Sequence, residues 1–211
     1  MATVLDLSNK ISELYAKKYK KDKKFFSNLT GNDGMCPVCG GAGYIEYGGD
    51  YYQSMRVECR ECEGTGFNKN LKKYKIKGKS IFDVWKMTLD EAIEFFEDID
   101  KSITKVCITA SEIMLGHLQM GQATATLSGG ENIRIKIMKA SKSIAKVIGV
   151  DEPFKGLSNI EIDAVANYLN RIREKERTLI VIDHSTSIED YFSEWIQIEN
   201  VNNILSGRRL K

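Results

Sequence analysis

Two short apolar runs in the second half of the chain end in side chains that suit phosphoryl-transfer chemistry. Residues 147–150 lead directly to Asp151 and Glu152, and residues 178–183 lead to His184. Continuous apolar runs are typical of buried parallel strands, and α/β sheets place ligand chemistry at the carboxyl ends of such strands. A carboxylate pair and a histidine there suit metal-assisted phosphoryl transfer. The competing interpretation of the carboxylate pair is a simple turn before the following proline.

Ser128-Gly129-Gly130-Glu131 is a second stretch whose residue types suit a phosphate. Ser128 and Glu131, three residues apart, have the pattern of a capping box, so a helix is expected to begin here. The two glycines leave backbone N–H groups of the first turn uncovered, and the helix dipole adds positive potential. Taken alone, this pattern favours an ordinary helix start without a ligand.

Four of the five cysteines lie in two copies of a CxxCxGxG pattern, at 36–43 and 59–66. Four thiolates in two tight turns satisfy the tetrahedral coordination of Zn²⁺ and leave no position for a reactive ligand. The glycines let backbone N–H groups approach the sulfur atoms. We therefore predict a structural zinc site with Cys36, Cys39, Cys59 and Cys62 as its ligands. Cys107 stands alone among apolar residues, as a small core side chain does.

The composition is that of a globular chain with a real core: 211 residues, 42% hydrophobic, with a net charge of +2. This length fits one large domain, or a domain with a small module. The sequence has no apolar run long enough for a membrane span and no recognisable signal segment, so we expect a cytoplasmic protein without membrane association. In a reducing compartment, paired cysteines indicate metal binding rather than disulfides.

Lysines are concentrated in two stretches. Residues 68–79 hold six lysines and no acid, and this stretch fits a nucleic-acid contact and a solvated loop equally well. The candidate contacts are Lys69, Lys72, Lys73, Lys75, Lys77 and Lys79. Lysines also crowd residues 17–24, where a solvated helix end is favoured over a phosphate-binding patch.

Hydrophobic periodicity outlines the elements that must position these groups. Helices are expected over 4–24 and 88–101, with a less patterned helical region over 102–121. A capping box at Ser158 and Glu161 begins a helix that runs to Lys175 with one face toward the sheet. Further expectations are a hairpin turning at Gly48-Gly49, a strand over 195–198 and a basic tail at 208–211.

The order of these features resembles the ATP-binding-cassette (ABC) ATPases. In that family Leu127–Glu131 corresponds to the signature motif, the strand ending in Asp151 and Glu152 to Walker B, and His184 to the switch histidine. Each motif alone is weak, but three in order over about 60 residues are specific. A CxxCxGxG pair upstream of the signature is similar to the UvrA family, in the C-terminal part of its second ATPase half, from about residue 5 to residue 199.

This resemblance implies roles for individual residues. Asp151 would hold Mg²⁺ through water, Glu152 would polarise the attacking water, and His184 would contact the γ-phosphate. The signature residues would bind the γ-phosphate of an ATP molecule held by another P-loop; they are Ser128, Gly129, Gly130 and Glu131.

The sequence also departs from the family pattern. UvrA-like halves begin with a strand, a P-loop and a glutamine loop, and this sequence starts after all three. Gly78-Lys79-Ser80 ends like a P-loop, but Lys73 stands where its first glycine belongs, and no apolar strand precedes it. Other departures are Ile133 for glutamine, Phe154-Lys155 for two threonines, and Asn32 and Met35 for basic residues that contact DNA.

We therefore expect an α/β fold: a partial ABC-type ATPase domain, with a short, mostly parallel sheet and helices, carrying a small four-cysteine zinc module. The chain would comprise an N-terminal basic helix (1–30), the zinc module with its basic loop (31–80), a helical signature subdomain (81–145) and a Walker B and switch-histidine core segment (146–211).

Two functions fit this outline. The first is a UvrA-like ATPase subunit of an excinuclease-type, DNA-binding repair process. It would share ATP and Mg²⁺ with a P-loop-bearing fragment or homologous subunit, as a hetero- or homo-oligomer, and hydrolyse ATP only with that partner. The alternative is a non-catalytic zinc module on a degenerate cassette, binding nucleic acid or protein. Retention of Glu152 and His184 favours the first function, and the missing P-loop favours the second.

Overall fold

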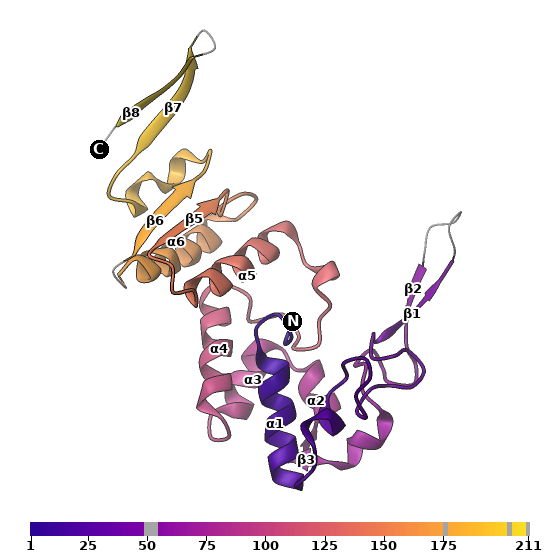
Figure 1. Ribbon diagram of the computed structural model, residues 1–211. Helices are drawn as coiled ribbons and strands as arrows, with labels where there is room; N and C mark the ends of the chain where they lie inside the picture. The colour runs from indigo at the N-terminus through magenta and orange to yellow at the C-terminus, as the bar shows by residue number, and fades with distance from the viewer. Residues whose placement is uncertain (49–54, 175–176, 202–203, 210–211) are drawn as a thin grey trace. The chain divides into compact units, whose positions relative to one another are not determined.

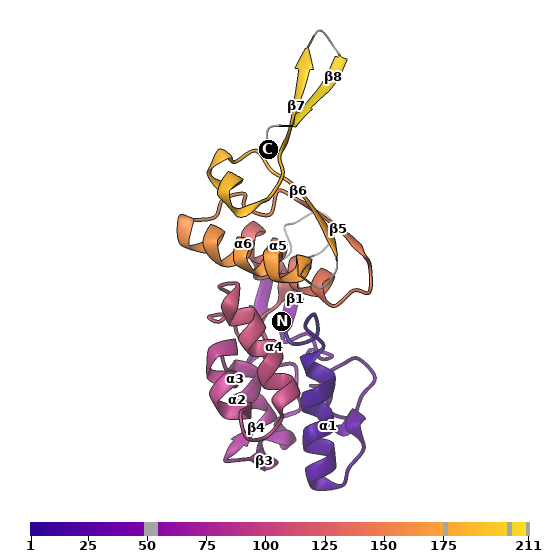
Figure 2. The same ribbon diagram turned by 90° about the vertical axis from the view of Figure 1, so that its left-hand side faces the viewer.

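The computed structural model describes residues 1–48, 55–174, 177–201 and 204–209. It divides into two compact units, which are taken separately below (Figures 1 and 2). The first unit comprises Met1–Ser111 and Leu115–Leu127, and the second comprises Glu112–Met114 and Ser128–Lys211. Helices and strands occur together, and the parallel pairing lies in the second unit, which confirms the α/β class.

The first unit is mainly helical, and polar side chains set where its helices begin. α1 spans Leu7–Tyr19 and ends because Lys20 adopts a left-handed conformation, so it is shorter than the predicted 4–24. Capping boxes begin α2 (Ile81–Lys86) and α3 (Leu89–Phe96). The predicted helix over 88–101 is shorter and ends at Phe96. α4 (Lys101–Glu112) lies in the helical region predicted over 102–121, and it starts where the Asp100 carboxylate accepts the N–H groups of Ser102 and Ile103.

The core of the first unit is built from apolar faces of these helices and from aromatic side chains of the loops. The fully buried members include Leu7, Ile11, Tyr15, Phe26, Phe67, Leu71, Ile81, Leu89, Phe96 and Ile103. Cys107 is buried among them, as expected of a core thiol. None of the helices in the described residues is long and apolar enough to cross a membrane.

Two small antiparallel hairpins complete the first unit. β1 (Tyr44–Tyr47) pairs with β2 (Met55–Glu58), as predicted, although the turn after Gly48 lies outside the described residues. β3 (Lys75–Ile76) pairs with β4 (Lys79–Ser80) around Lys77 and Gly78, which both have positive φ. The tight turn at Gly78 and the capping role of Ser80 explain the likeness to a P-loop ending without any phosphate loop.

The second unit contains the strand–helix–strand arrangement that the sequence predicts. α5 (Gly129–Ser141) is followed by β5 (Val147–Asp151), α6 (Asn159–Arg173) and β6 (Thr178–Ile182). β5 and β6 are parallel, in a register that runs from Val147 opposite Thr178 to Asp151 opposite Ile182. Their carboxyl ends therefore lie side by side.

Within the described residues, this two-stranded sheet is covered on one face only. Ile148 is buried, and the alternate residues Val150, Leu179 and Val181 are partly buried, on the face that packs against α6. The inward side chains of α6 are the predicted ones, Ile162, Val165, Leu169 and Ile172. The opposite face exposes Val147, Ile180 and Ile182, at 58%, 50% and 57% of their surface. Parallel sheets are normally buried on both faces, so this bare apolar face is incomplete.

The end of the chain differs from the expected third strand and basic tail. β7 (Ile196–Val201) includes most of the predicted strand over 195–198, but it pairs with β8 (Ile204–Arg209) as an antiparallel hairpin. In the described part of the chain, neither strand pairs with β5 or β6. The reason is local: Arg208 and Arg209 occupy ladder positions opposite Gln197 and Ile196 and extend the hairpin.

Candidate active site and metal centre

The four predicted zinc ligands meet at one point. The sulfur atoms of Cys36, Cys39, Cys59 and Cys62 all lie within 4.8 Å of one another. The Sγ atoms of Cys36 and Cys59 are 4.0 Å apart, and those of Cys39 and Cys62 are 3.7 Å apart. A tetrahedral zinc with Zn–S bonds of about 2.3 Å requires S–S edges of about 3.8 Å. The cluster therefore fits a structural Zn²⁺ site.

The two cysteine turns hold each other through their backbones. Cys36 N–H donates to the carbonyl of Gly66, and Cys59 N–H donates to that of Gly43, at 2.8 and 2.9 Å. The same two glycines donate N–H bonds to sulfur, Gly43 to Cys39 Sγ and Gly66 to Cys62 Sγ. A Cβ at Gly43 would lie 2.4 Å from the carbonyl oxygen of Gly64. The doubled glycine pattern is therefore required by this close approach.

The second site forms where β5 and β6 end. Glu152 adopts a left-handed backbone conformation (φ 46°), and its N–H donates to the carbonyl of Ile182 at 2.8 Å. Left-handed non-glycine residues are costly and are concentrated at functional sites. This turn brings Glu152 Oε1 to 3.5 Å from His184 Nε2 and Oε2 to 2.6 Å from Lys155 Nζ. The structure thus joins Glu152 and His184, as the sequence predicts.

Charge around Glu152 favours its ionised form. The hydrogen bond from the Lys155 ammonium, with smaller help from the charges of Lys155 and His184, lowers the pKa of the Glu152 carboxyl. Asp183 faces the same region, and its two carboxylate oxygens accept the N–H groups of Phe154 and Ser185 at 3.2 and 2.9 Å. Asp183 therefore ties the chain that follows β5 to the chain that follows β6.

These groups line a cavity of about 540 Å³ in the second unit. Its walls combine ionisable side chains with apolar ones from the start of α6: Glu152, Phe154, Lys155, Gly156, Leu157, Asn159, Ile162, Asp183, His184 and Ser185. Asp151 is exposed at the end of β5 and is not in this lining. Its carboxylate is accessible to a hydrated cation, which fits a water-mediated Mg²⁺ contact.

The signature residues form a helix start that lies outside this cavity lining. Ser128 Oγ accepts the N–H of Glu131, and the Glu131 carboxylate accepts the N–H of Ser128, which is the predicted capping box. Ser128 and Gly129 are not buried, and a Cβ on Gly129 would meet no atom within 4 Å. None of these residues lines the Glu152 cavity. Gly130 adjoins the wall of that cavity, because a Cβ on it would lie 3.0 Å from the Leu157 side chain.

A partly buried ion pair joins α5, which begins after Ser128, to α6, which follows β5. Arg134 on α5 is buried, and its Nη1 lies 2.5 Å from Glu161 Oε1 on α6. Glu161 also accepts N–H and O–H bonds from Ser158 at 2.9 Å. Arg134 lowers the pKa of Glu161 from 4.5 to about 2, with help from Ser158. One carboxylate thus serves both the helix cap and the ion pair.

The six candidate nucleic-acid lysines separate into two groups. Three have acidic partners: Lys69 with Glu61, Lys72 with Glu63 and Lys77 with Asp98. The other three, Lys73, Lys75 and Lys79, have no carboxylate oxygen within 4 Å in the described part of the chain, although the charges of Lys75 and Lys79 act on Asp83 from a greater distance. Residues 68–79 contain no acidic residue, but in the folded chain three of the six lysines pair with carboxylates from other segments.

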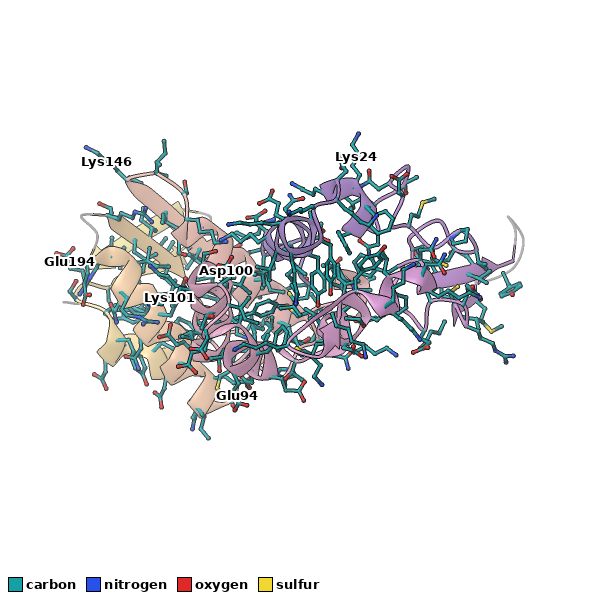
Figure 3. The ribbon with its side chains drawn as sticks, turned by 90° about the horizontal axis from the view of Figure 1, so that it is seen from below. Lys24, Glu94, Asp100, Lys101, Lys146 and Glu194 are labelled. Atoms are coloured by element: carbon teal, nitrogen blue, oxygen red, sulfur yellow. The ribbon has the colours of Figure 1, made fainter. Side chains whose placement is uncertain are left out.

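The segment around Lys75 also meets the basic end of α1. Tyr19 Oη donates to the carbonyl of Lys75 and accepts its N–H, both at 2.7 Å, and Lys18 Nζ donates to the same carbonyl. Tyr74 packs edge-on against the rings of Tyr19 and Phe25. Lys24, in the short helix after α1, extends into solvent (Figure 3). The two lysine-rich stretches of the sequence therefore form one surface.

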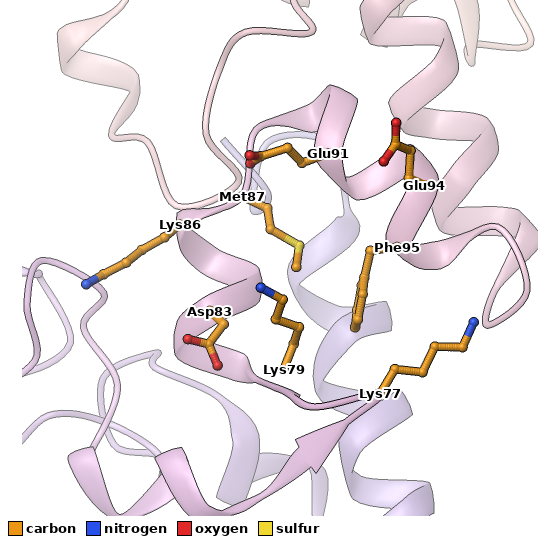
Figure 4. A pocket seen from close by; sticks show the side chains of 8 residues that line it. All are labelled: Lys77, Lys79, Asp83, Lys86, Met87, Glu91, Glu94 and Phe95. Atoms are coloured by element: carbon orange, nitrogen blue, oxygen red, sulfur yellow. The ribbon is translucent and has the colours of Figure 1, made fainter.

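A further cavity, of about 590 Å³, lies between α2, α3 and the β3–β4 hairpin (Figure 4). Its lining is Lys77, Lys79, Asp83, Lys86, Met87, Glu91, Glu94 and Phe95. Three ammonium groups balance three carboxylates, and two of those carboxylates belong to capping boxes. The net charge of the lining is therefore zero, and it favours neither an anion nor a cation.

The sequence analysis did not assign a function to two residues of the candidate active site, Lys155 and Asp183. Lys155 stands out in the sequence only as a replacement for a usual threonine, and Asp183 only as the residue before His184. An i,i+3 spacing between Glu152 and Lys155 was the available signal, but it indicates contact only in a helix or turn.

Comparisons with known proteins give the chain relatives over most of its length. No protein-family model matches it. It is 34% identical to the UvrABC system protein A of Rickettsia bellii over 181 residues, 84% of this chain and 19% of that protein. The Thermus thermophilus UvrABC system protein A is 31% identical over 196 residues, 89% of this chain and 20% of that protein. The crystal structure of UvrA2 from Deinococcus radiodurans matches with a TM-score of 0.82 and 29% identity, over 93% of this chain and 25% of that one. The chain spans about a fifth of the length of these curated relatives.

Proposed function

We propose that this chain, which is UvrA-like in sequence and in fold, supplies the water-activating side of composite ATP sites whose P-loop comes from a partner chain. The observation that carries the proposal is the meeting of Glu152, His184 and Asp183 at the ends of two parallel strands. The sequence retains these groups without any GxxxxGK[ST] motif. The P-loop must therefore lie outside these 211 residues.

In this proposal each group has a distinct task. Bound ATP and Mg²⁺ supply the electrophilic phosphorus and neutralise charge on the phosphates. Glu152 orients the attacking water and accepts its proton, and His184 donates a hydrogen bond to the terminal phosphate. Asp151 holds the hydrated cation. The start of α5, at Ser128 to Glu131, contacts the phosphate of a second ATP across an interface.

The bare sheet face supports the existence of a partner. Val147, Ile180 and Ile182 expose half or more of their surface on a parallel sheet that needs cover on both sides. Both outer edges of the β5–β6 pair also lack a neighbouring strand in the described residues. Strands added by a P-loop-bearing partner, either a fragment or a homologous subunit, would complete the sheet and bring the P-loop to its carboxyl edge.

The biological setting in this proposal is excinuclease-type DNA repair in the cytoplasm. The relatives are named as protein A of the UvrABC system. The surface formed by α1 and the Lys73–Lys79 segment presents ammonium groups beside aromatic rings, and those of Lys73, Lys75 and Lys79 make no close ion pair in the described residues, which suits a phosphate backbone. None of the five cysteines, all of which the structure describes, forms a disulfide, which agrees with a reducing compartment.

A second candidate is a non-catalytic zinc module that binds nucleic acid or protein on an inactive cassette. One observation favours it: the Glu152 carboxylate is already held by Lys155 at 2.6 Å. Against it stands the left-handed backbone at Glu152, whose conformational cost an inactive site has no need to retain.

Reconstitution tests the first proposal. The purified chain alone should not hydrolyse ATP, and addition of a P-loop-bearing UvrA-like fragment should produce turnover. Glu152→Gln should reduce that turnover by about 10²–10⁴-fold while preserving an ATP-bound complex, because the amide keeps the shape and loses the base. Glu174→Gln, an exposed change at the end of α6, is the matched control. Turnover by the chain alone, unaffected by Glu152→Gln, would falsify the proposal.

A further inference from the structure

The Lys155 ammonium contacts the Glu152 carboxylate, which the proposed reaction needs as its base. This contact supports a further inference, which rests on the proposed function. We propose that Lys155 is a positioning residue that restrains turnover, because its ammonium holds the Glu152 carboxylate in an ion pair that competes with the attacking water. The contact is 2.6 Å between Lys155 Nζ and Glu152 Oε2.

The ion pair is built into a fixed turn. Lys155 N–H donates to the carbonyl of Glu152 at 3.3 Å, which closes the turn and returns the lysine stem toward the carboxylate. Glu152 itself is fixed by its bond to the carbonyl of Ile182. Between them Phe154 is 3% exposed and packs against the ring of Phe192. The backbone on both sides of the ion pair is therefore anchored in the unit, although Lys155 itself is 69% exposed.

The surrounding charges keep the ammonium in this place. The hydrogen bond and charge of Glu152, followed by the charges of Asp151 and Asp183, raise the pKa of Lys155, so the group stays protonated. The other Glu152 oxygen faces His184 at 3.5 Å. Both oxygens of the proposed base thus have a partner, and the ammonium occupies an acceptor position on Oε2 for which the attacking water must compete.

An exposed ion pair is weak, so the restraint should be partial. Exposed pairs typically stabilise by an amount that corresponds to an equilibrium constant of about two to five. The unpaired fraction of the carboxylate is then about one third to one sixth, so removal of the ammonium should raise kcat by about threefold to sixfold and leave KM nearly unchanged. A lysine whose role was only structural would give no such split between kcat and KM.

The first arm of the test uses the whole chain alone. The lysine ammonium region of the ¹H–¹⁵N NMR spectrum should show a Lys155 signal, assigned by its loss in Lys155→Met, that shifts in Glu152→Gln. The signal of Lys146, an exposed lysine before β5, should not shift (Figure 3). A Lys155 signal that is the same in wild type and Glu152→Gln would overturn the proposal, because the ion pair would not exist in solution.

The second arm uses the chain with its P-loop-bearing partner. Lys155→Met should raise kcat, Lys155→Arg should restore the wild-type value because it keeps the pair, and Lys146→Met should change nothing. In the Glu152→Gln background, Lys155→Met should have no effect. An unchanged or lower kcat in Lys155→Met would overturn the restraint. Absence of turnover in the wild type would overturn the proposed function instead, while the NMR arm would still decide the ion pair.

Discussion

At the scale of single residues, the zinc site could be predicted from the sequence more completely than the surroundings of Glu152. The zinc cluster follows from spacing alone, because a CxxC turn fixes two sulfur atoms locally and the doubled pattern requires only that two turns meet. The surroundings of Glu152 depend on its left-handed backbone conformation. None of the residue types in Asp151–Pro153 predicts that conformation. For that reason the sequence predicted Glu152 as the base and did not predict its contact with Lys155.

The metal site gives a prediction at this scale. Purified chain should contain one zinc per molecule, and Cys36→Ser should lose both the zinc and the fold of residues 30–67. Structural zinc binds small modules with an apparent free energy of about 10–16 kcal/mol, so loss of a ligand should unfold the module rather than loosen it. Elemental analysis and amide-resolved NMR would check this. Cys107→Ala is the control, because Cys107 lies outside the cluster and should keep full zinc content.

At the scale of elements, the ion pair between α5 and α6 should make the free energy of unfolding depend on pH in the acidic range. The folded-state pKa of Glu161 is about 2, below its ordinary value of 4.5. A carboxyl with a lowered folded pKa contributes stability above its unfolded pKa and loses it as the pH falls toward the folded value. The contribution should therefore disappear between about pH 4.5 and pH 2. Urea unfolding across this window should show a smaller slope of stability against pH in Glu161→Gln than in wild type; equal slopes would contradict the prediction.

The partner residue on α5 should matter more than the carboxylate. Arg134 is 3% exposed, and its removal leaves Glu161 without its counter-charge. Breaking a buried pair by removing one member costs about 3–5 kcal/mol. Because Glu161 keeps some solvent contact, Arg134→Met should lower the free energy of unfolding in urea by about 3 kcal/mol, the lower end of that range. A decrease below about 1 kcal/mol, the range of surface pairs, would show that the pair is not structural.

The lysine surface of the first unit permits a matched comparison of two triple variants. Charge reversal of Lys73, Lys75 and Lys79, which have no carboxylate oxygen within 4 Å in the described residues, should weaken binding to duplex DNA. It should also reduce the log–log salt slope by about 0.9 for each phosphate that is no longer neutralised. Reversal of the paired lysines, Lys69, Lys72 and Lys77, should have a smaller effect. Equal effects from the two triples, measured by fluorescence anisotropy, would mean that pairing does not decide which lysines bind.

Elements were predicted best where a local rule determines their start. The capping boxes at Ser128 and Ser158 begin α5 and α6, as expected from their sequence. The early end of α3 at Phe96 and the β7–β8 hairpin were missed. The next helix starts only at Lys101, where the Asp100 side chain turns back to its own backbone, and the hairpin requires a second strand at Ile204–Arg209 that the sequence did not predict. The ion pair of Arg134 with Glu161 could not be predicted from the sequence either, because the two residues lie on separate helices.

At the scale of the whole molecule, the bare face of β5 and β6 tests whether a partner completes the fold. Ile180→Lys with Ile182→Lys should leave the chain stable, within about 0.5 kcal/mol in urea, because both side chains already expose half their surface. Association with a P-loop-bearing partner should weaken by about a hundredfold or more. Burying an isoleucine contributes about 1.5–3 kcal/mol, and an unpaired ammonium in its place opposes burial.

The matched control for this variant is Ile160→Lys. Ile160 is 70% exposed, but it lies on α6 rather than on the sheet, so this change should leave association intact. Isothermal titration calorimetry gives the affinity of all three chains, and a negative heat-capacity change for wild type would report apolar burial. If the double variant bound the partner as tightly as wild type, this face would not be the interface. The P-loop would then have to reach Glu152 by another route, with the apolar strands still uncovered.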